Sequence, residues 1–563
     1  MILAVGIAVV AITYWRIWYG VDLTDESFYV VEPYRFVIGA RPFVDETSVT
    51  QQTTALLVYP FVRAYYAFEG VTGVVLFVRH LQFLLSLLVG WAVFSSLRVF
   101  LERSCALLIA LAAVVFVPFT VHSLSYDSVG SSLFTVGCLL GVRSLVDRRP
   151  RRSAALAGAC LGLAAYAYLP LVVPVAVCVA VRAALARRGR VGGGVPHALL
   201  ALGLPAVGMA AVVATAGFST VVDDYRRSSR FLGQAGGLHK LHLIASHEWT
   251  TLPLWYALLP ALVLLVILWR VRPVLALPLL AALPFLARPP KVVDFAASLE
   301  YVAHFGWLAL PLFLLVRRRH GATLLLLGVW LPALVAGLMT AYSSANGGVN
   351  FGVGFFPAAI VAAVFLVFAF EDALVGAGRA ELRWLAVIPA AGVLALLVVA
   401  DTLPVYRDGT LSKLTARVTT GPYAGLETTP WKLGWLGRLR SDLASVGPNC
   451  TISFFNDFPA GYLLTEARPD TNDAWVATVA RSLVRTYQDE LIGYFRRHSY
   501  PDVAVVVRRI PYTRNSGRSN YYWGNEPLVN VLRPPAYRLV RYRRGYSIFE
   551  RSGTPCALKT LHD

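Results

Sequence analysis

The chain has 563 residues, of which 57% are hydrophobic and only 15% are charged, and its mean hydropathy is +0.61. A soluble domain normally has roughly a quarter of its residues charged. A large soluble protein is therefore excluded, because much of the first four hundred residues would have to be core, with too little polar surface to cover it. The net charge of +19 is explained in part by basic anchors beside membrane spans. The basic residues on an outward-facing surface favour anionic lipid headgroups or a phosphorylated lipid over nucleic acid as a partner.

Apolar blocks of about 17–25 residues, the length that crosses a bilayer core, follow one another up to about Ala400. Each is predicted to be a helix, because backbone polar groups in hydrocarbon must be paired within the segment. The first block lacks a charged start, and Trp15, Arg16 and Trp18 replace a small-residue cleavage site, which predicts an uncleaved span rather than a signal peptide. We expect a helix at the outer surface over 53–70 and about thirteen spans, near residues 1–19, 74–98, 105–121, 129–146, 154–168, 170–186, 197–217, 250–270, 274–287, 303–316, 321–341, 354–371 and 384–400.

Positive charges predict the orientation, because short loops rich in Arg or Lys stay in the cytoplasm. The loop 21–52 is acidic and therefore belongs outside. From a cytoplasmic N-terminus, every basic cluster then falls inside, and the odd number of spans leaves the C-terminal part outside the plasma (inner) membrane. These clusters are Arg148, Arg149, Arg151 and Arg152; Arg187, Arg188 and Arg190; Arg270 and Arg272; Arg317, Arg318 and Arg319; and Arg379 and Arg383.

Acidic residues follow the first span directly, as Asp22, Asp25 and Glu26. Carboxylates at a membrane boundary are costly unless they are solvated, paired or used. They indicate either a solvated acidic loop that supports the outside orientation, or a general base or metal ligand held at the membrane surface. A second outer turn, between the third and fourth spans, places the lone carboxylate Asp127 between two apolar helices.

Two later outer loops also carry polar residues. The loop from Arg288 includes Lys291 and continues to His304, and the loop 342–354 is rich in glycine and carries Asn346 and Asn350. Glycine-rich turns bring backbone N–H groups close to an anion, although such a loop is also explained as a plain connection. Together the loops predict a site at the outer boundary, for a substrate with its tail in the bilayer and its head outside.

The composition changes at Asp401, after which no spanning segment remains. We therefore divide the chain into a transmembrane domain, 1–401, and an extracytoplasmic domain, 402–563. Short apolar runs at 451–455 and 503–507, with a helix predicted over 478–497 between them, indicate a small α/β layer. Cys450 and Cys556 are the only cysteines of this part, and an oxidising compartment makes them a candidate disulfide.

At the outer boundary the sequence resembles a known family. The first span followed by DLTDESFY, then GARPFVDE and a Gln-rich approach to Pro60, is similar to the GT-C superfamily of membrane glycosyltransferases, in the branch of protein O-mannosyltransferases and lipid A aminoarabinose transferases. The segments 421–428 and 457–462 resemble outer-domain segments of actinobacterial relatives. The resemblance implies a polytopic helical fold with an outer C-terminal domain, and transfer of a sugar from a polyprenyl-phosphate donor to a lipid, cell-wall glycan or protein acceptor.

This resemblance implies roles for the boundary residues. Asp25 matches the base that takes the proton of the acceptor hydroxyl in an inverting transfer, with Glu26 as its helper and Asp22 as the alternative base. Cations that stabilise the leaving phosphate matter more than a general acid, and the candidates are Arg79, His80 and Lys291. Alternatively, Arg79 extends to the interface and His80 is an ordinary helix residue. Asp127, His304, Asn346 and Asn350 complete the predicted substrate site; a divalent metal is compatible with it but not required.

Other classes stay open from the sequence. One of them is another lipid-linked saccharide transferase or polymerase. A transporter would also carry polar residues in its spans, but it usually shows related halves and broken helices, and the sequence has no visible repeat.

Overall fold

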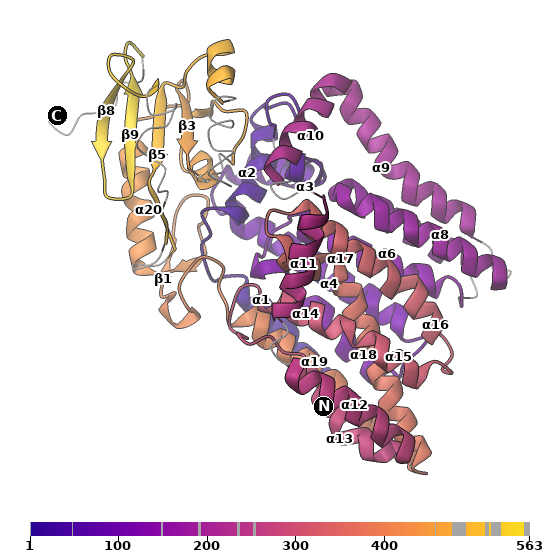
Figure 1. The fold of residues 1–563 in the computed structure, drawn as a ribbon. Coiled ribbons are helices and arrows are strands. Elements are labelled where there is room, and N and C mark those ends of the chain that lie inside the picture. Colours follow the sequence, from indigo (N-terminus) through magenta and orange to yellow (C-terminus); the bar gives the residue numbers. More distant parts are fainter. Residues whose placement is uncertain are drawn as a thin grey trace.

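The structure is a computed structural model that describes residues 2–47, 49–147, 150–189, 193–232, 237–251, 255–456, 458–475, 491–512, 517–519, 531–554 and Cys556. Helices fill the chain up to Thr402, and the first strand of the described part begins at Ala416. The helical part and the sheet-bearing part lie at opposite ends of the molecule, and α2 lies near their junction (Figure 1).

The helical part begins with two helices that bracket the acidic loop. The helix α1 is Ile2–Arg16 and α2 is Asp25–Val37, so the segment expected to be an acidic loop is a helix from Asp25 onward. The remaining helices are α3 (Val49–Glu69), α4 (Val74–Leu97), α5 (Arg103–Val115), α6 (Tyr126–Arg143), α7 (Pro150–Ala167), α8 (Val172–Gly189), α9 (Gly194–Ala216), α10 (Phe218–Leu232), α11 (Gly237–Thr251), α12 (Trp255–Val271), α13 (Leu277–Leu286), α14 (Ala297–Trp307), α15 (Ala309–Val316), α16 (Ala322–Leu325), α17 (Leu331–Ser343), α18 (Phe351–Gly376) and α19 (Val387–Thr402).

Seven helical segments of the described chain are long and apolar enough to cross a membrane, and the bent pair α11 and α12 raises this number to eight if it forms one span. Three shorter apolar helices accompany them, at Ile2–Arg16, Arg103–Val115 and Pro273–Leu286. The chain is thus a multi-pass membrane protein, whereas the expected number of thirteen spans stays a prediction. The surface helix expected over 53–70 corresponds to α3.

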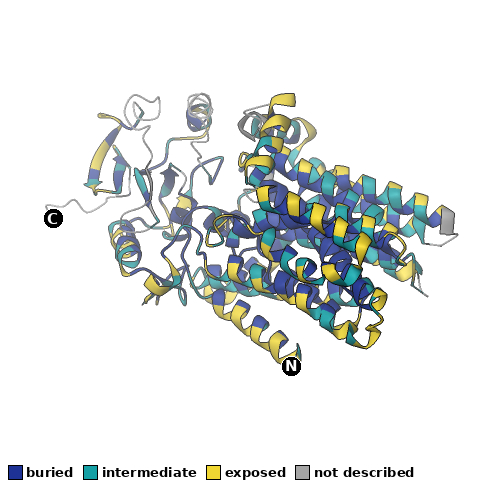
Figure 2. Cartoon of the chain, turned by 60° about the horizontal axis from the view of Figure 1, so that its bottom comes forward, coloured by how far each residue is buried: buried dark blue, intermediate teal, exposed yellow. Residues whose placement is uncertain are grey.

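The helix α18 forms the centre of the bundle, and nearly all of its residues are buried. It approaches its neighbours through glycine. A Cβ on Gly352 would lie 2.3 Å from the carbonyl oxygen of Leu299 in α14, and one on Gly354 would lie 2.3 Å from the backbone of Ala336 in α17. Exposed residues follow the outer faces of the surrounding helices, while buried residues fill the interior (Figure 2).

The sheet-bearing part contains a mixed five-stranded sheet in the order β4-β3-β5-β9-β8. Its strands β3 (Thr451–Phe455) and β5 (Val503–Val507) are the two runs predicted from the sequence, and they pair in parallel. The helix expected between them is described only from 491, where it runs to 497; its earlier part lies outside the described residues. The other elements are α20 (Pro430–Leu443), β1 (Ala416–Arg417), β2 (Glu427–Thr428), β4 (Arg468–Pro469), β6 (Arg509–Pro511), β7 (Gly517–Ser519), β8 (Tyr537–Tyr542) and β9 (Tyr546–Arg551).

The sheet-bearing part is closed by the expected disulfide. Cys450 and Cys556 are joined, with their Cα atoms 5.9 Å apart. The bond attaches the end of the described chain to the start of β3.

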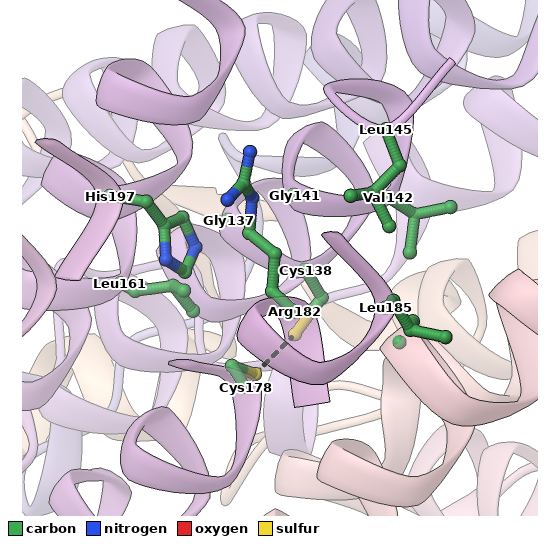
Figure 3. A pocket seen from close by; sticks show the side chains of 11 residues that line it. Gly137, Cys138, Gly141, Val142, Leu145, Leu161, Cys178, Arg182, Leu185 and His197 are labelled. Atoms are coloured by element: carbon green, nitrogen blue, oxygen red, sulfur yellow. Dashed lines mark hydrogen bonds between the residues drawn. The ribbon is translucent and has the colours of Figure 1, made fainter. Parts of the chain in front are cut away.

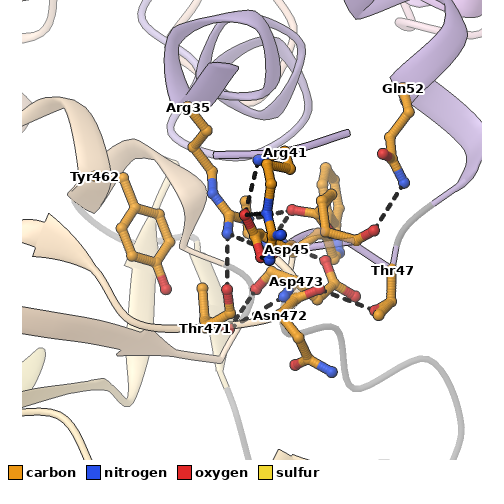
Figure 4. A network of polar contacts seen from close by, with 12 residues as sticks. Arg35, Arg41, Asp45, Thr47, Gln52, Tyr462, Thr471, Asn472 and Asp473 are labelled. Carbon is orange, nitrogen blue, oxygen red and sulfur yellow. Dashed lines mark hydrogen bonds and ion pairs between the residues drawn. The ribbon is translucent and has the colours of Figure 1, made fainter. Parts of the chain in front are cut away.

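Backbone hydrogen bonds join the two parts. The chain that leaves α1 pairs with β2, because Glu427 N–H donates to the carbonyl of Trp18 and Gly20 N–H donates to Glu427, each at 2.8 Å. A second junction surrounds the buried Arg35 of α2, which forms an ion pair with Glu46 and donates to the carbonyl of Thr471 at 2.7 Å (Figure 4). The first outer loop is therefore held by the sheet-bearing part at several points.

Candidate active site

Asp22 organises the start of α2. Its Oδ1 accepts from the hydroxyl of Thr24 at 2.6 Å, and its Oδ2 accepts from the backbone N–H of Glu26 at 2.8 Å. The carboxylate thus caps the free N–H groups at the helix start. Burial raises the pKa of Asp22 to about 6, with the Asp25 carboxylate adding to the rise and Arg407 opposing it.

Asp25 is the first residue of α2, and its side chain is 22% exposed. Its Oδ2 accepts a hydrogen bond from the hydroxyl of Tyr406 at 2.8 Å and forms an ion pair with the guanidinium of Arg407. Both partners come from the segment after α19, about 380 residues later in the chain. The carboxylate is therefore oriented by groups that the sequence gives no reason to place beside it.

A cavity of about 230 Å³ opens at Asp25. Its lining combines carboxylates, a cation, an amide and aromatic rings from five segments of the helical part and from the segment after α19: Asp25, Tyr29, Pro118, Phe119, Val121, Ser125, Tyr126, Asp127, Phe295, Ala296, Asn346, Val349, Tyr406 and Arg407. The cavity thus brings together three of the residues named from the sequence, Asp25, Asp127 and Asn346.

Asp127 lies in the first turn of α6, just before the apolar part of that helix. The side chain is buried, and Oδ1 has no hydrogen-bond partner within the described residues. Burial raises the pKa of Asp127 to about 8, and the nearby Asp25 carboxylate adds to this. The two acids of the cavity are thus in different surroundings, since Asp25 forms an ion pair with Arg407, whereas Asp127 forms none with any described residue.

Arg407 is the functional candidate that sequence reasoning missed. It has a left-handed backbone with φ of 48°, which is uncommon for a residue with a side chain and marks positions held by their surroundings. The buried Lys432 of α20 holds this turn, because its Nζ donates to the carbonyls of Arg407 at 2.8 Å and of Val21 at 2.7 Å. Asp408 completes the clamp by pairing with Lys432 at 3.2 Å.

Arg79 and His80 are not at this cavity, which corrects the expected phosphate clamp. Arg79 is buried and makes two hydrogen bonds of 2.6 Å to Glu26, and it also donates to the carbonyls of Ile17 and Gly20. All its donors are thus engaged in holding α1 to α2, and Glu26 pairs with Arg79 rather than with Asp25. The His80 ring contacts the carbonyl of Leu76 at 2.8 Å and the hydroxyl of Tyr14 at 3.3 Å, away from the cavity.

Only one of the candidate residues on the later loops lies at the cavity. Asn346 lines the cavity. Asn350 is fully buried and is not part of the lining, and Lys291 is exposed elsewhere. His304 is buried within α14, where its Nε2 lies 3.3 Å from the hydroxyl of Thr251. The sequence pattern of loops and helices does not indicate which of these side chains lies near Asp25.

A second cavity lies within the helices (Figure 3). It is lined by Cys138, Cys178, Arg182 and His197, and its two thiol sulfurs are 3.5 Å apart. Its volume of about 10 Å³ is at the lower limit for one water molecule. It is therefore too small to be a substrate site. Throughout the described residues, no group of three or more His, Cys, Asp or Glu is arranged to hold a metal ion.

Comparison with known proteins identifies solved structures with a similar fold. No family model matches the sequence, and no curated protein matches it. The crystal structure of ArnT from Cupriavidus metallidurans in the apo state is similar over 97% of both chains, with 11% identity and a TM-score of 0.50. The same protein bound to undecaprenyl phosphate gives 12% identity and 0.47 over the same shares. The oligosaccharyltransferase of Archaeoglobus fulgidus tethered with an acceptor peptide covers 90% of this chain and 69% of its own, at 12% identity and 0.44.

The match to apo ArnT covers 97% of this chain. The chain therefore has a fold similar to that of ArnT, and the polytopic helical fold with a small C-terminal sheet region that the sequence predicts is confirmed.

Proposed function

We propose that the chain is a membrane glycosyltransferase that moves a sugar from a polyprenyl-phosphate donor to a glycan, glycolipid or protein acceptor. The observation that carries this proposal is the position of Asp25, a partly exposed carboxylate that is held by Tyr406 and Arg407 and lines a cavity with other polar residues. The shared fold supports it, because ArnT has been crystallised bound to undecaprenyl phosphate.

In the proposed reaction, Asp25 accepts the proton of the acceptor hydroxyl. The hydroxyl oxygen attacks the anomeric carbon of the donor sugar, and the bond from that carbon to the phosphate oxygen breaks. The polyprenyl phosphate leaves with the bonding electrons, and the configuration at the anomeric carbon is inverted. A base positioned in this way typically contributes about 10²–10⁴-fold in rate.

Arg407 takes the role first assigned to Arg79 and His80. It is the cation that lines the cavity, and a guanidinium binds phosphate oxygens through paired hydrogen bonds. The donor phosphate competes with Asp25 for this guanidinium, so that donor binding both neutralises the phosphate and releases the base. Asp127 and Asn346 then contact the sugar hydroxyls from the other walls of the cavity.

The two-part division of the chain fits this function. We place residues 1–401 in the membrane and residues 402–563 outside, with the N-terminus in the cytoplasm. The acidic loop and the sheet-bearing part are joined by the bonds around Glu427 and Arg35, so both belong on the same side of the membrane.

The test is Asp25→Asn in purified full-length protein supplied with radiolabelled undecaprenyl-phosphate sugars and a membrane or cell-wall acceptor fraction. Transfer should be lost while donor binding and the folded state remain, because the amide has nearly the same shape but cannot take the proton. Glu69→Gln, an exposed acid at the end of α3, is the matched control and should transfer normally. Near-normal turnover in Asp25→Asn would remove this residue as the base, and a larger loss in Asp22→Asn would move the role there.

A further inference from the structure

A second concave site lies in the sheet-bearing part. It is a groove of about 880 Å³ between the first turns of α20, the start of β6 and the turn that joins β8 to β9. Four of its lining residues are arginines, Arg438, Arg509, Arg543 and Arg544, and the lining also includes Trp431. None of the lining residues belongs to the Asp25 cavity.

The groove has an excess of positive charge. Asp442 is the carboxylate that pairs with its arginines, and it is already engaged by Arg543 at 3.0 and 3.1 Å and by the hydroxyl of Tyr546 at 2.7 Å. Arg438 and Arg544 are exposed, and neither has a carboxylate partner within the described residues. Exposed guanidiniums gathered in a concave surface favour a carboxylate or phosphate ligand.

An indole lies beside these charges. Trp431 is half-buried and makes no ring contact with another aromatic side chain of the described chain. Its neighbour Trp435 is buried and packs edge-on against Phe458 and Tyr546, with ring centroids 5.6 Å apart in both pairs. Trp435 therefore supports the groove, whereas Trp431 offers a flat apolar surface of the kind on which the C–H face of a sugar ring packs.

The groove is preformed by backbone contacts. The carbonyl of Gly545 accepts from the N–H groups of Arg508 at 2.8 Å and Arg509 at 3.1 Å, which fixes the β8–β9 turn against β6. A Cβ at Gly545 would lie 2.8 Å from Nε1 of Trp435. The turn therefore packs so closely against the indole that a side chain at this position would clash with it. A ligand would not have to order these walls on binding.

The helix α20 connects this groove to the active site. Trp431 lines the groove, and the next residue, Lys432, donates to the carbonyls of Val21 and Arg407 beside Asp25. A polymer bound in the groove would thus contact α20, the helix that also holds the chain beside Asp25.

We propose that this groove binds an anionic glycan, a saccharide that carries carboxylates or phosphates, as the acceptor of the transfer. This inference rests on the proposed function and narrows its acceptor class. A lipid surface fits less well, because the lining contains arginines, aromatic residues and one glycine but no aliphatic side chain that would enter the acyl region.

The test measures binding to full-length protein in detergent, without any transfer reaction. The probes are tetragalacturonate, which carries carboxylates, a phosphorylated mannose tetrasaccharide and neutral maltotetraose. At least one acidic probe should bind, with an affinity that falls as salt rises, and maltotetraose should bind at least about tenfold more weakly. The double variant Arg438→Gln with Arg544→Gln should weaken the acidic probe about tenfold or more, because both side chains are exposed and their loss does not disturb packing.

Two controls make the result specific. Arg440→Gln changes an exposed arginine on the same helix that binds Thr420 outside the groove, and it should bind like the parent protein. Trp431→Leu should weaken the acidic tetrasaccharides but not a simple anion such as citrate. Equal binding of the acidic and neutral probes, or no effect of the double variant, overturns the proposal, and so does groove-dependent binding confined to vesicles of phosphatidylglycerol.

The same assay separates this inference from the proposed function. Asp25→Asn should keep full binding of the acidic probe, since Asp25 does not line the groove. Loss of sugar transfer chemistry with intact groove binding would leave the groove assignment standing. Intact transfer to a short neutral acceptor, without groove binding, would leave the proposed function standing and remove the acceptor class.

Discussion

At the residue scale, the proposed active site combines one carboxylate that the sequence indicates, Asp25, with one cation that it does not indicate, Arg407. Asp25 is visible because acids directly after an apolar span need a reason. Arg407 is one of many arginines, and only the fold brings it across 382 positions to Asp25. Arg79 was the better guess from its place at the outer end of a span, but its hydrogen bonds to Glu26 and to loop carbonyls already occupy it.

The role of Arg407 is tested by substitution. Arg407→Met keeps the length and apolar stem of the side chain but removes the charge, and it should lower transfer by about 10²–10³-fold, the usual cost of losing a preorganised group at a developing charge. Donor affinity should fall as well, because the cation binds the phosphate in the ground state. The measurement is transfer rate beside donor binding, with His80→Gln as a control that should change neither. A large loss in His80→Gln would restore the first assignment.

The surroundings of Asp127 predict a pH dependence. Its pKa is raised to about 8, so below that value the group is mostly protonated and can donate a hydrogen bond to a sugar hydroxyl. Transfer should therefore fall as pH rises through about 8, with the slope of a single proton. Asp127→Asn keeps a donor at every pH and should remove this decline, while an unchanged profile in the variant would assign the decline to another group.

At the scale of elements, the helix α20 and the segment after α19 together hold the chain around Val21 and Asp25. Both strands at 451–455 and 503–507 are read directly from short apolar runs. The start of α2 was less visible, although Asp22, Thr24 and Glu26 form a pattern of helix-capping residues. No local sequence pattern indicates that Lys432 is buried, because the same helix, α20, also carries exposed arginines.

The clamp predicts the effect of Lys432→Met. The substitution keeps the volume but leaves Asp408 buried without its ion-pair partner, and removing one member of a buried pair costs about 3–5 kcal/mol. Transfer should fall further than the fraction of folded protein, because the carbonyls of Val21 and Arg407 lose their donor. Thermal unfolding and transfer rate are measured together. Lys413→Met, at an exposed lysine of the same part, is the control, and equal behaviour of the two variants would show that the clamp has no function.

At the scale of the whole molecule, the composition was sufficient for the class of protein and the first outer loop for its fold, which the structure of apo ArnT matches from end to end. The sequence does not define the number of spans, because polar helix ends and bent helices obscure the boundaries between them. The helices α11 and α12, for example, meet at 77°. The junctions between the helical and sheet-bearing parts were not predictable, since each includes backbone groups, such as those of Trp18, Glu427 and Thr471, and backbone groups have no sequence signature.

Because of these junctions, one labelling experiment tests the orientation of both parts of the molecule in the membrane. The bonds from Trp18, Gly20 and Arg35 to the sheet-bearing part indicate that the acidic loop and the sheet-bearing part share one side of the membrane. The positive charges predict that the arginine loops lie on the other side. A thiol introduced as Ser412→Cys, at an exposed position after α19, should react with an impermeant maleimide from outside intact cells, whereas Arg318→Cys should react only after the membrane is opened. The native thiols in the described chain are buried or half-buried and the remaining pair is a disulfide, so the background should be low. Labelling of Ser412→Cys only from the cytoplasmic side would show the opposite topology. It would also exclude an acceptor on the outer face, because the cavity at Asp25 would then face the cytoplasm.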